Sequence, residues 1–169
     1  MGIFDNFTSK PPKGYAEVKV EFTEEESKAV HRTLKRYASV FNADAPEGTE
    51  AIVPQKVKDC MTAQGLIEYV EDLMRTLRDC DSDGEMASLM DKAIKAQMKA
   101  YAIHNLPVYL FQIAGMFERT GDAGNAKEFF RQFLQTQGNF KPDHIDTMFL
   151  SQTGFDIPQI VAMAREKVR

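Results

Sequence analysis

Three aspartates in a short acidic segment are the clearest candidates in this chain for binding a metal ion. Asp79, Asp81 and Asp83 occupy alternate positions just before a glycine. That pattern matches the first half of an EF-hand loop, in which alternating carboxylates wrap a calcium ion. The twelfth loop position, which requires a bidentate glutamate, is Met90. The spacing therefore predicts a weak cation site at most, or alternatively a polar turn in which Ser82 or Asp83 caps the next helix.

The histidines and cysteines do not have the spacing of metal ligands or of a catalytic group. His31 and His104 are far apart and form no metal-binding pair with the remaining histidine. His104 is expected at the C-terminal end of a helix, where the dipole favours an imidazolium. Cys60 and Cys80 lack a designated base nearby and are typical of small apolar core residues. No phosphate loop or nucleophile elbow occurs, so an enzyme is the weaker interpretation and no cofactor is expected.

Composition narrows the range of partners and locations. The 169 residues carry a formal net charge of −4, with 43% hydrophobic and 27% charged residues, which are ordinary globular values. An acidic chain is a poor binder of nucleic-acid phosphates. No segment approaches the ~20 apolar residues of a membrane-spanning helix. Two cysteines fit a reducing compartment, so we expect a cytoplasmic protein of bacterial type, with no nucleic-acid or membrane partner.

Strict alternation of apolar and charged residues over 16–22 predicts a β-strand or an extended arm. The short run 51–53 is the one candidate partner within the chain, and three residues cannot cover a strand of seven. One edge should therefore recruit another strand, either across a homodimer or from a partner protein. The alternative is an arm lying in a groove of the chain's own helices.

The rest of the chain has helical periodicity. Thr23 followed by Glu26 forms a capping box, which predicts a helix start. Apolar residues at helical spacing predict helices from Thr23 to about residue 41 and over 62–78, 86–101, 106–119, 123–136, 143–150 and 158–168. The predicted fold is mainly α, a bundle or repeat-like array of six to seven helices. The arm is expected over 1–22 and a single helical domain over 23–169.

Within that domain, large apolar, small and aromatic residues recur at fixed spacing, followed by a Gly-Asp turn, an alanine and an aromatic. These residues are Leu110, Ile113, Ala114, Phe117, Gly121, Asp122, Ala126 and Phe130. In this pattern residues 107–140 resemble a single tetratricopeptide motif, which is a helix-turn-helix unit. Gly138 replaces the motif's proline, and Phe133 replaces a small residue. A lone motif needs neighbours to cover it, and the helices in 141–169 would cap it.

The resemblance implies a protein-binding scaffold whose groove is lined by the first helix of the motif. By position, the residues expected to contact a protein or peptide are Val108, Phe111, Gln112, Gly115, Glu118 and Arg119. The favoured function is thus a non-enzymatic adaptor or assembly protein. Two alternatives stay open. One is a small metal- or ligand-binding regulator that uses the acidic turn, and the other is an enzyme whose active site cannot be identified from the sequence. A structural alternative also remains for the groove itself: the helix over 87–104 fills it, so that no partner can bind there.

Methionine is the one unusual component of the composition, at nine residues. Met74, Met90, Met98 and Met116 fall on predicted helix faces, where core packing is the ordinary explanation. A methionine-rich surface that adapts to a partner is the alternative.

Overall fold

The computed structural model describes residues 20–43, 46–47 and 53–169. Its helices are α1 (Glu24–Asn42), α2 (Gln55–Arg78), α3 (Asp83–Ile103), α4 (Val108–Arg119), α5 (Ala123–Asn139), α6 (His144–Thr153) and α7 (Ile157–Lys167). The mainly α prediction is confirmed. No strand occurs among the described residues. The predicted strand lies outside them up to residue 19, and its remaining three residues, Val20–Phe22, have no regular structure.

Local side-chain caps explain where several of these helices begin. The Thr23 hydroxyl accepts the Glu26 backbone N–H at 3.2 Å, and the Glu26 carboxylate accepts the Thr23 N–H at 2.9 Å. This is the capping box that the sequence predicts. The Ser82 hydroxyl accepts the Glu85 backbone N–H at the start of α3, and Asp122 accepts that of Asn125 at the start of α5, each without a reciprocal bond. Each cap satisfies a backbone donor that has no partner within its own helix.

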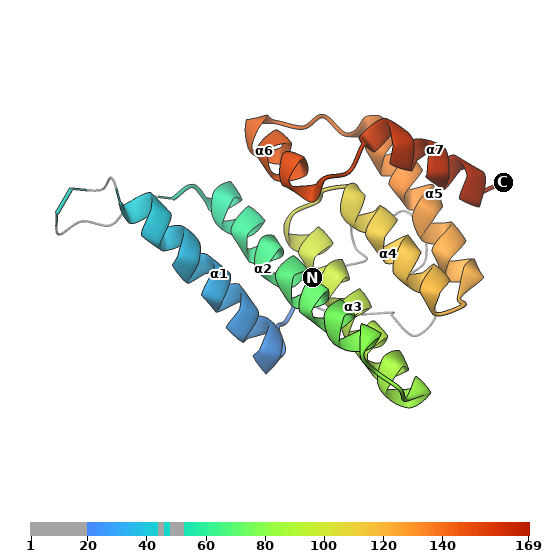
Figure 1. Ribbon diagram of the computed structural model, residues 1–169. Coiled ribbons are helices and arrows are strands. Elements are labelled where there is room, and N and C mark those ends of the chain that lie inside the picture. The colour runs from blue at the N-terminus through green and yellow to red at the C-terminus, as the bar shows by residue number, and fades with distance from the viewer. Residues whose placement is uncertain (1–19, 44–45, 48–52) are drawn as a thin grey trace.

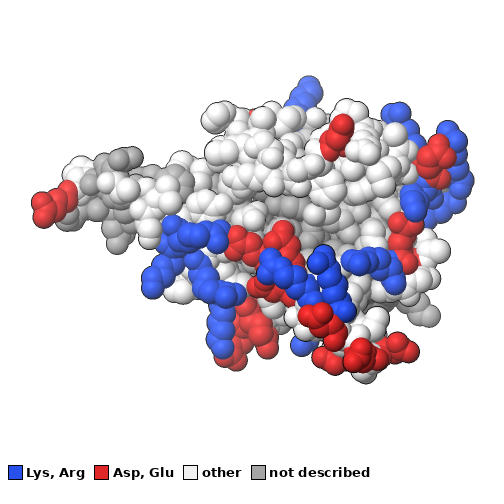
Figure 2. Space-filling model, in the orientation of Figure 1, with Lys and Arg blue, Asp and Glu red and all other residues white. Residues whose placement is uncertain are grey.

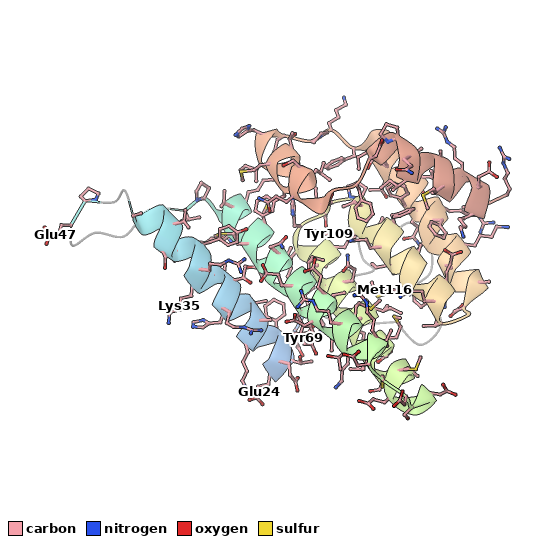
Figure 3. All side chains as sticks on the ribbon, viewed as in Figure 1. Glu24, Lys35, Glu47, Tyr69, Tyr109 and Met116 are labelled. Carbon is pink, nitrogen blue, oxygen red and sulfur yellow. The ribbon has the colours of Figure 1, made fainter. Side chains whose placement is uncertain are left out.

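The helices pack largely in chain order. Successive contacts join α1 to α2, α2 to α3, α3 to α4 and α4 to α5, and α7 packs on α5. Figure 1 shows α2 and α4 running in the same direction, because α3 returns the chain between them. One apolar cluster extends through all seven helices, from Val30 in α1 to Ala164 in α7. Figure 3 shows Lys35 pointing away from the other helices, whereas Met116 points from α4 toward α2.

Helices α1 and α2 approach each other closely at Gly65. A Cβ atom built at this glycine would lie 2.7 Å from the Val30 Cα and 3.3 Å from the Thr33 Cβ. The absence of a side chain at Gly65 therefore allows the two backbones to meet. Beside this contact the Thr33 hydroxyl donates to Glu68 at 2.7 Å, and Arg36 pairs with the same carboxylate at 2.6 Å.

A buried ion pair joins α1 to α3. The Lys99 ammonium donates to the Glu26 carboxylate at 2.6 Å, and both side chains are more than nine-tenths buried. The same carboxylate oxygen, Oε1, accepts the capping hydrogen bond from Thr23. Since the other oxygen, Oε2, is buried without a hydrogen-bond partner, Lys99 is the main compensation for this buried charge.

The predicted helices lie close to those observed, with one clear correction. The structure begins α2 at Gln55, seven residues before the predicted start at Thr62. Val57, Cys60 and Met61 are apolar and supply the first inward-facing positions. Lys56, Lys58 and Asp59 interrupt them and hide the periodicity in the sequence. None of the described helices has a long enough apolar stretch to cross a lipid bilayer.

Candidate functional site

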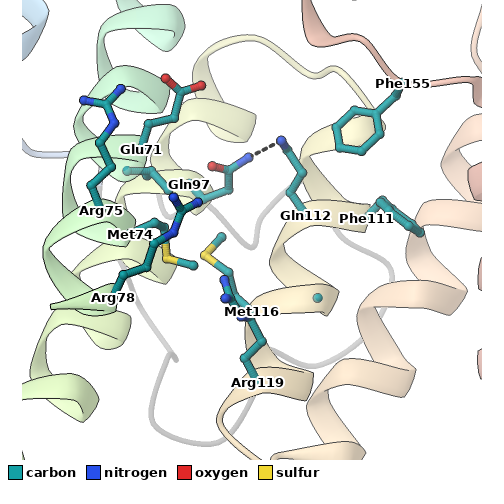
Figure 4. A pocket seen from close by; sticks show the side chains of 12 residues that line it. Glu71, Met74, Arg75, Arg78, Gln97, Phe111, Gln112, Met116, Arg119 and Phe155 are labelled. Carbon is teal, nitrogen blue, oxygen red and sulfur yellow. Dashed lines mark hydrogen bonds between the residues drawn. The ribbon is translucent and has the colours of Figure 1, made fainter. Parts of the chain in front are cut away.

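A groove of about 510 Å³ separates α2 from α4. Its α2 wall carries Val70, Glu71, Met74, Arg75 and Arg78, and its α4 wall carries Phe111, Gln112, Gly115, Met116 and Arg119. Gln97 of α3 and Phe155, which precedes α7, complete the lining. Figure 4 shows the two walls facing each other across an open space. The volume is in the range of ordinary ligand-binding clefts.

Four of the six predicted contact residues line this groove. Phe111, Gln112, Gly115 and Arg119 all lie in its α4 wall. Val108 does not, because it is fully buried in the core. Glu118 also lies outside the lining, since it faces α7 and pairs with Lys167 at 2.6 Å.

The opposite wall was not predicted from sequence. Met74, Arg75 and Arg78 lie more than thirty residues from their counterparts on α4. They face those counterparts only because α3 brings α4 back alongside α2. α3 corresponds to the helix over 87–104 that was the alternative occupant of the groove. It contributes Gln97 to the lining and leaves the space between α2 and α4 open.

An amide pair bridges the groove between α3 and α4. The Gln97 side chain donates from Nε2 to Oε1 of Gln112 at 2.6 Å (Figure 4). This bond leaves the amide nitrogen of Gln112 with hydrogen atoms to donate, and Gln112 is only half-buried. The bridge therefore offers polar groups inside a lining that is otherwise rich in apolar side chains.

Phe111 is fixed by three aromatic neighbours. Its ring centroid lies 5.6 Å from that of Phe130, 5.4 Å from that of Phe133 and 5.9 Å from that of Phe155. Phe130 and Phe133 belong to α5, so this cluster ties the groove to the second helix of the pair. Edge-to-face contacts of this kind restrict ring motion, which makes Phe111 a rigid part of the wall.

The residues behind the tetratricopeptide resemblance form the inner contacts of the α4–α5 pair. Ala114, Phe117, Ala126 and Phe130 are all buried. Gly121 has a φ of 79°, the left-handed conformation expected of a glycine after the first helix. These positions explain why α4 and α5 pack closely. Whether the pair belongs to the tetratricopeptide family stays an interpretation of the sequence.

The three aspartates of the acidic segment are spread over the connection from α2 to α3. Asp79 follows the last residue of α2, Asp81 is exposed, and Asp83 is the first residue of α3. Ser82 caps α3, as the turn interpretation predicts. Throughout the described part of the chain, no group of three or more His, Cys, Asp or Glu side chains is arranged to hold a metal ion.

A second polar cluster lies where α2, the end of α3 and the start of α6 meet. The His104 Nε2 atom lies 2.9 Å from the Asp146 Oδ1 atom, and both residues are buried. Lys56 pairs with Asp146 at 3.1 Å and also with Asp143. His104 follows the last residue of α3, as predicted, but this buried partner was not foreseen.

Hydrogen bonds set the protonation of the two carboxyls in this cluster. Burial alone would raise the pKa of Asp146, but bonds from His104, the Asp143 backbone and Lys56 lower it below its ordinary value. The Asp146 backbone N–H and then Lys56 lower the pKa of Asp143 to about 2. Burial raises the pKa of the neighbouring Cys60 thiol to about 11, and the charge of Asp146 adds to that effect. A thiol in this state is a poor nucleophile.

Comparison with protein-family models, with curated proteins and with solved structures finds no match to this chain.

Proposed function

We propose that this protein is a non-enzymatic scaffold that binds a peptide segment of a partner protein in the groove between α2 and α4. The groove carries this proposal, because a concave surface lined by apolar and aromatic side chains with a few polar groups is typical of binding sites. Its lining combines apolar, aromatic, amide and charged side chains, a mixture suited to a polypeptide.

Gly115 provides a test of the groove that is separable from folding. A Cβ atom at this position would meet no heavy atom within 4 Å, so a larger side chain can extend into the groove without displacing the core. Replacing a mid-helix glycine also removes about 0.5–1 kcal/mol of destabilisation. Gly115→Leu should therefore obstruct the groove while leaving the thermal midpoint unchanged or higher.

The experiment selects peptides from a random display library on the full-length protein and measures their affinity by fluorescence anisotropy. We expect Gly115→Leu to weaken the selected peptides by tenfold or more. The matched control is Gly138→Leu in α5, which also has open space around its Cβ and lies outside the groove. This control should bind as the unmodified protein does. Equal affinity for Gly115→Leu, or no selected peptide at all, would overturn the proposal.

A further inference from the structure

The groove differs in character from one end to the other. Phe111, Phe155 and the Gln97–Gln112 bridge lie at one end, and the backbones of Arg78 and Arg119 lie at the other, from which the Arg78 side chain extends toward Gln97 (Figure 4). Arg78 is the last residue of α2 and Arg119 is the last residue of α4. Because α2 and α4 run in the same direction, both helices place an arginine at the same end of the groove.

These two guanidinium groups have no ion-pair partner among the described carboxylates. Arg75, by contrast, is paired with Asp72 at 2.8 Å. Glu71 is the single acidic side chain in the described lining, against three arginines. Figure 2 shows basic side chains over the middle of this face, with acidic ones between them. The end of the groove at which α2 and α4 finish, the arginine end, thus carries two guanidinium groups that no described carboxylate pairs with, beside the acidic segment that begins at Asp79.

Two methionines lie between the ends. Met74 and Met116 approach each other from opposite walls, and Met74 is only half-buried (Figure 4). Unbranched thioether side chains adapt to differently shaped apolar groups. Arginine binds planar carboxylates through two parallel hydrogen bonds. The groove is therefore aromatic and amide at one end, and in the rest of its length the two methionines lie between the Arg78 and Arg119 guanidinium groups (Figure 4).

We infer that the occupant of the groove is an acidic-apolar segment of a partner protein. Side-chain carboxylates of this segment bind Arg78 and Arg119, and an apolar side chain between them packs on Met74 and Met116. This inference rests on the proposed function and adds the chemistry of the ligand. Charge complementarity is its main support, since two cations on either side of an apolar surface are best matched by carboxylates that flank an apolar side chain.

The test uses synthetic fluorescein-labelled peptides in which Leu or Met alternates with Asp or Glu, and matched peptides with Asn or Gln at the acidic positions. Binding to the full chain is measured by anisotropy at low and high salt. We expect the acidic peptides to bind at least tenfold more tightly than the amide peptides at low salt, with a smaller ratio at high salt. Arg78→Glu and Arg119→Glu should each weaken the acidic peptides by tenfold or more.

Arg165→Glu is the matched control, because Arg165 is an exposed arginine in the last turn of α7, outside the groove lining. It should leave affinity unchanged while reporting any general effect of charge reversal at a helix end. Equal binding of acidic and amide peptides, with loss in Gly115→Leu, would overturn this inference and leave the proposed function intact. Peptide affinity that is unchanged by Gly115→Leu would overturn both this inference and the proposed function. Preferential groove binding of a labelled single-stranded oligonucleotide would also contradict the inference.

Discussion

Asp146 connects three elements through one carboxylate. Its Oδ1 atom contacts His104, which follows α3, and Lys56 of α2, and its Oδ2 atom accepts the Asp143 backbone N–H at the start of α6. A buried carboxylate with this many donors is held in its ionised form. The charge of this one side chain therefore contributes to the attachment of α6, together with the packing of Phe149 in the core.

Acid should weaken this attachment over a defined pH range. The pKa values of Asp143 and Asp146 are lower in the folded state than in the unfolded state, so the unfolded chain binds more protons in acid. Their stabilisation is complete above about pH 5 and is lost as pH falls toward about 2. Urea unfolding at a series of pH values should show this loss. Asp146→Asn should reduce the acid-dependent loss and cost about 1–3 kcal/mol at neutral pH.

Asp72→Asn is a suitable control for that experiment, because Asp72 is exposed and pairs only with Arg75 on its own helix. It should keep the acid dependence of the unmodified protein. Identical pH profiles for Asp146→Asn and Asp72→Asn would show that the cluster at α6 is not the source.

Two buried alanines should not tolerate larger side chains. Ala114 in α4 and Ala126 in α5 are at most 2% exposed. Added methylenes at either position must displace neighbours in a packed interior. Ala114→Leu and Ala126→Leu should each lower the free energy of unfolding by about 1–3 kcal/mol. Unchanged thermal midpoints in both variants would contradict close packing of α4 on α5.

At the scale of elements, the contact between α1 and α2 depends on one glycine. Gly65→Ala would place a methyl group 2.7 Å from the Val30 Cα, a backbone atom that cannot move by itself. We expect it to destabilise the protein by about 1–3 kcal/mol despite the better helix propensity of alanine. Gly115→Ala is the matched control and should stabilise by about 0.5–1 kcal/mol, because its Cβ has open space. Chemical denaturation of both variants measures the difference.

Helix starts were readable from sequence where their signals are local. The boxes and caps at Thr23, Ser82, Asp122 and Asp143 act within three residues of their own position. The start of α2 was missed because charged residues interrupt its apolar positions, and the fold alone decides which of them face inward. Short-range side-chain chemistry therefore predicts most of the elements and few of their contacts.

The same distinction applies to the candidate site. The resemblance to a tetratricopeptide motif implied that Phe111, Gln112, Gly115 and Arg119 line a groove, and all four do. The α2 wall was not expected, because its position depends on how α3 returns the chain. The His104–Asp146 contact spans 42 residues and has no local signal in the sequence. Both features could have been found only from the packing of helices that are distant in the chain.

At the scale of the whole molecule, packing in chain order resembles that of repeat arrays, in which stability is distributed among neighbouring helices. α3 buries nine residues, whereas α6 and α7 bury two each. Amide hydrogen exchange should therefore be fastest in α6 and α7 and slowest in α3 and α4. Uniform protection across all seven helices would contradict this gradient and indicate a single cooperative unit.

The two cysteines differ enough in environment to make the native protein ready for selective labelling. Cys60 is fully enclosed and its thiol resists ionisation, so a maleimide dye cannot readily attach to it. Cys80 is partly exposed in the turn after α2, two residues beyond Arg78. A dye would therefore attach at one position, beside the arginine end of the groove, without any engineered substitution. Its emission would report occupancy of that end directly during a titration.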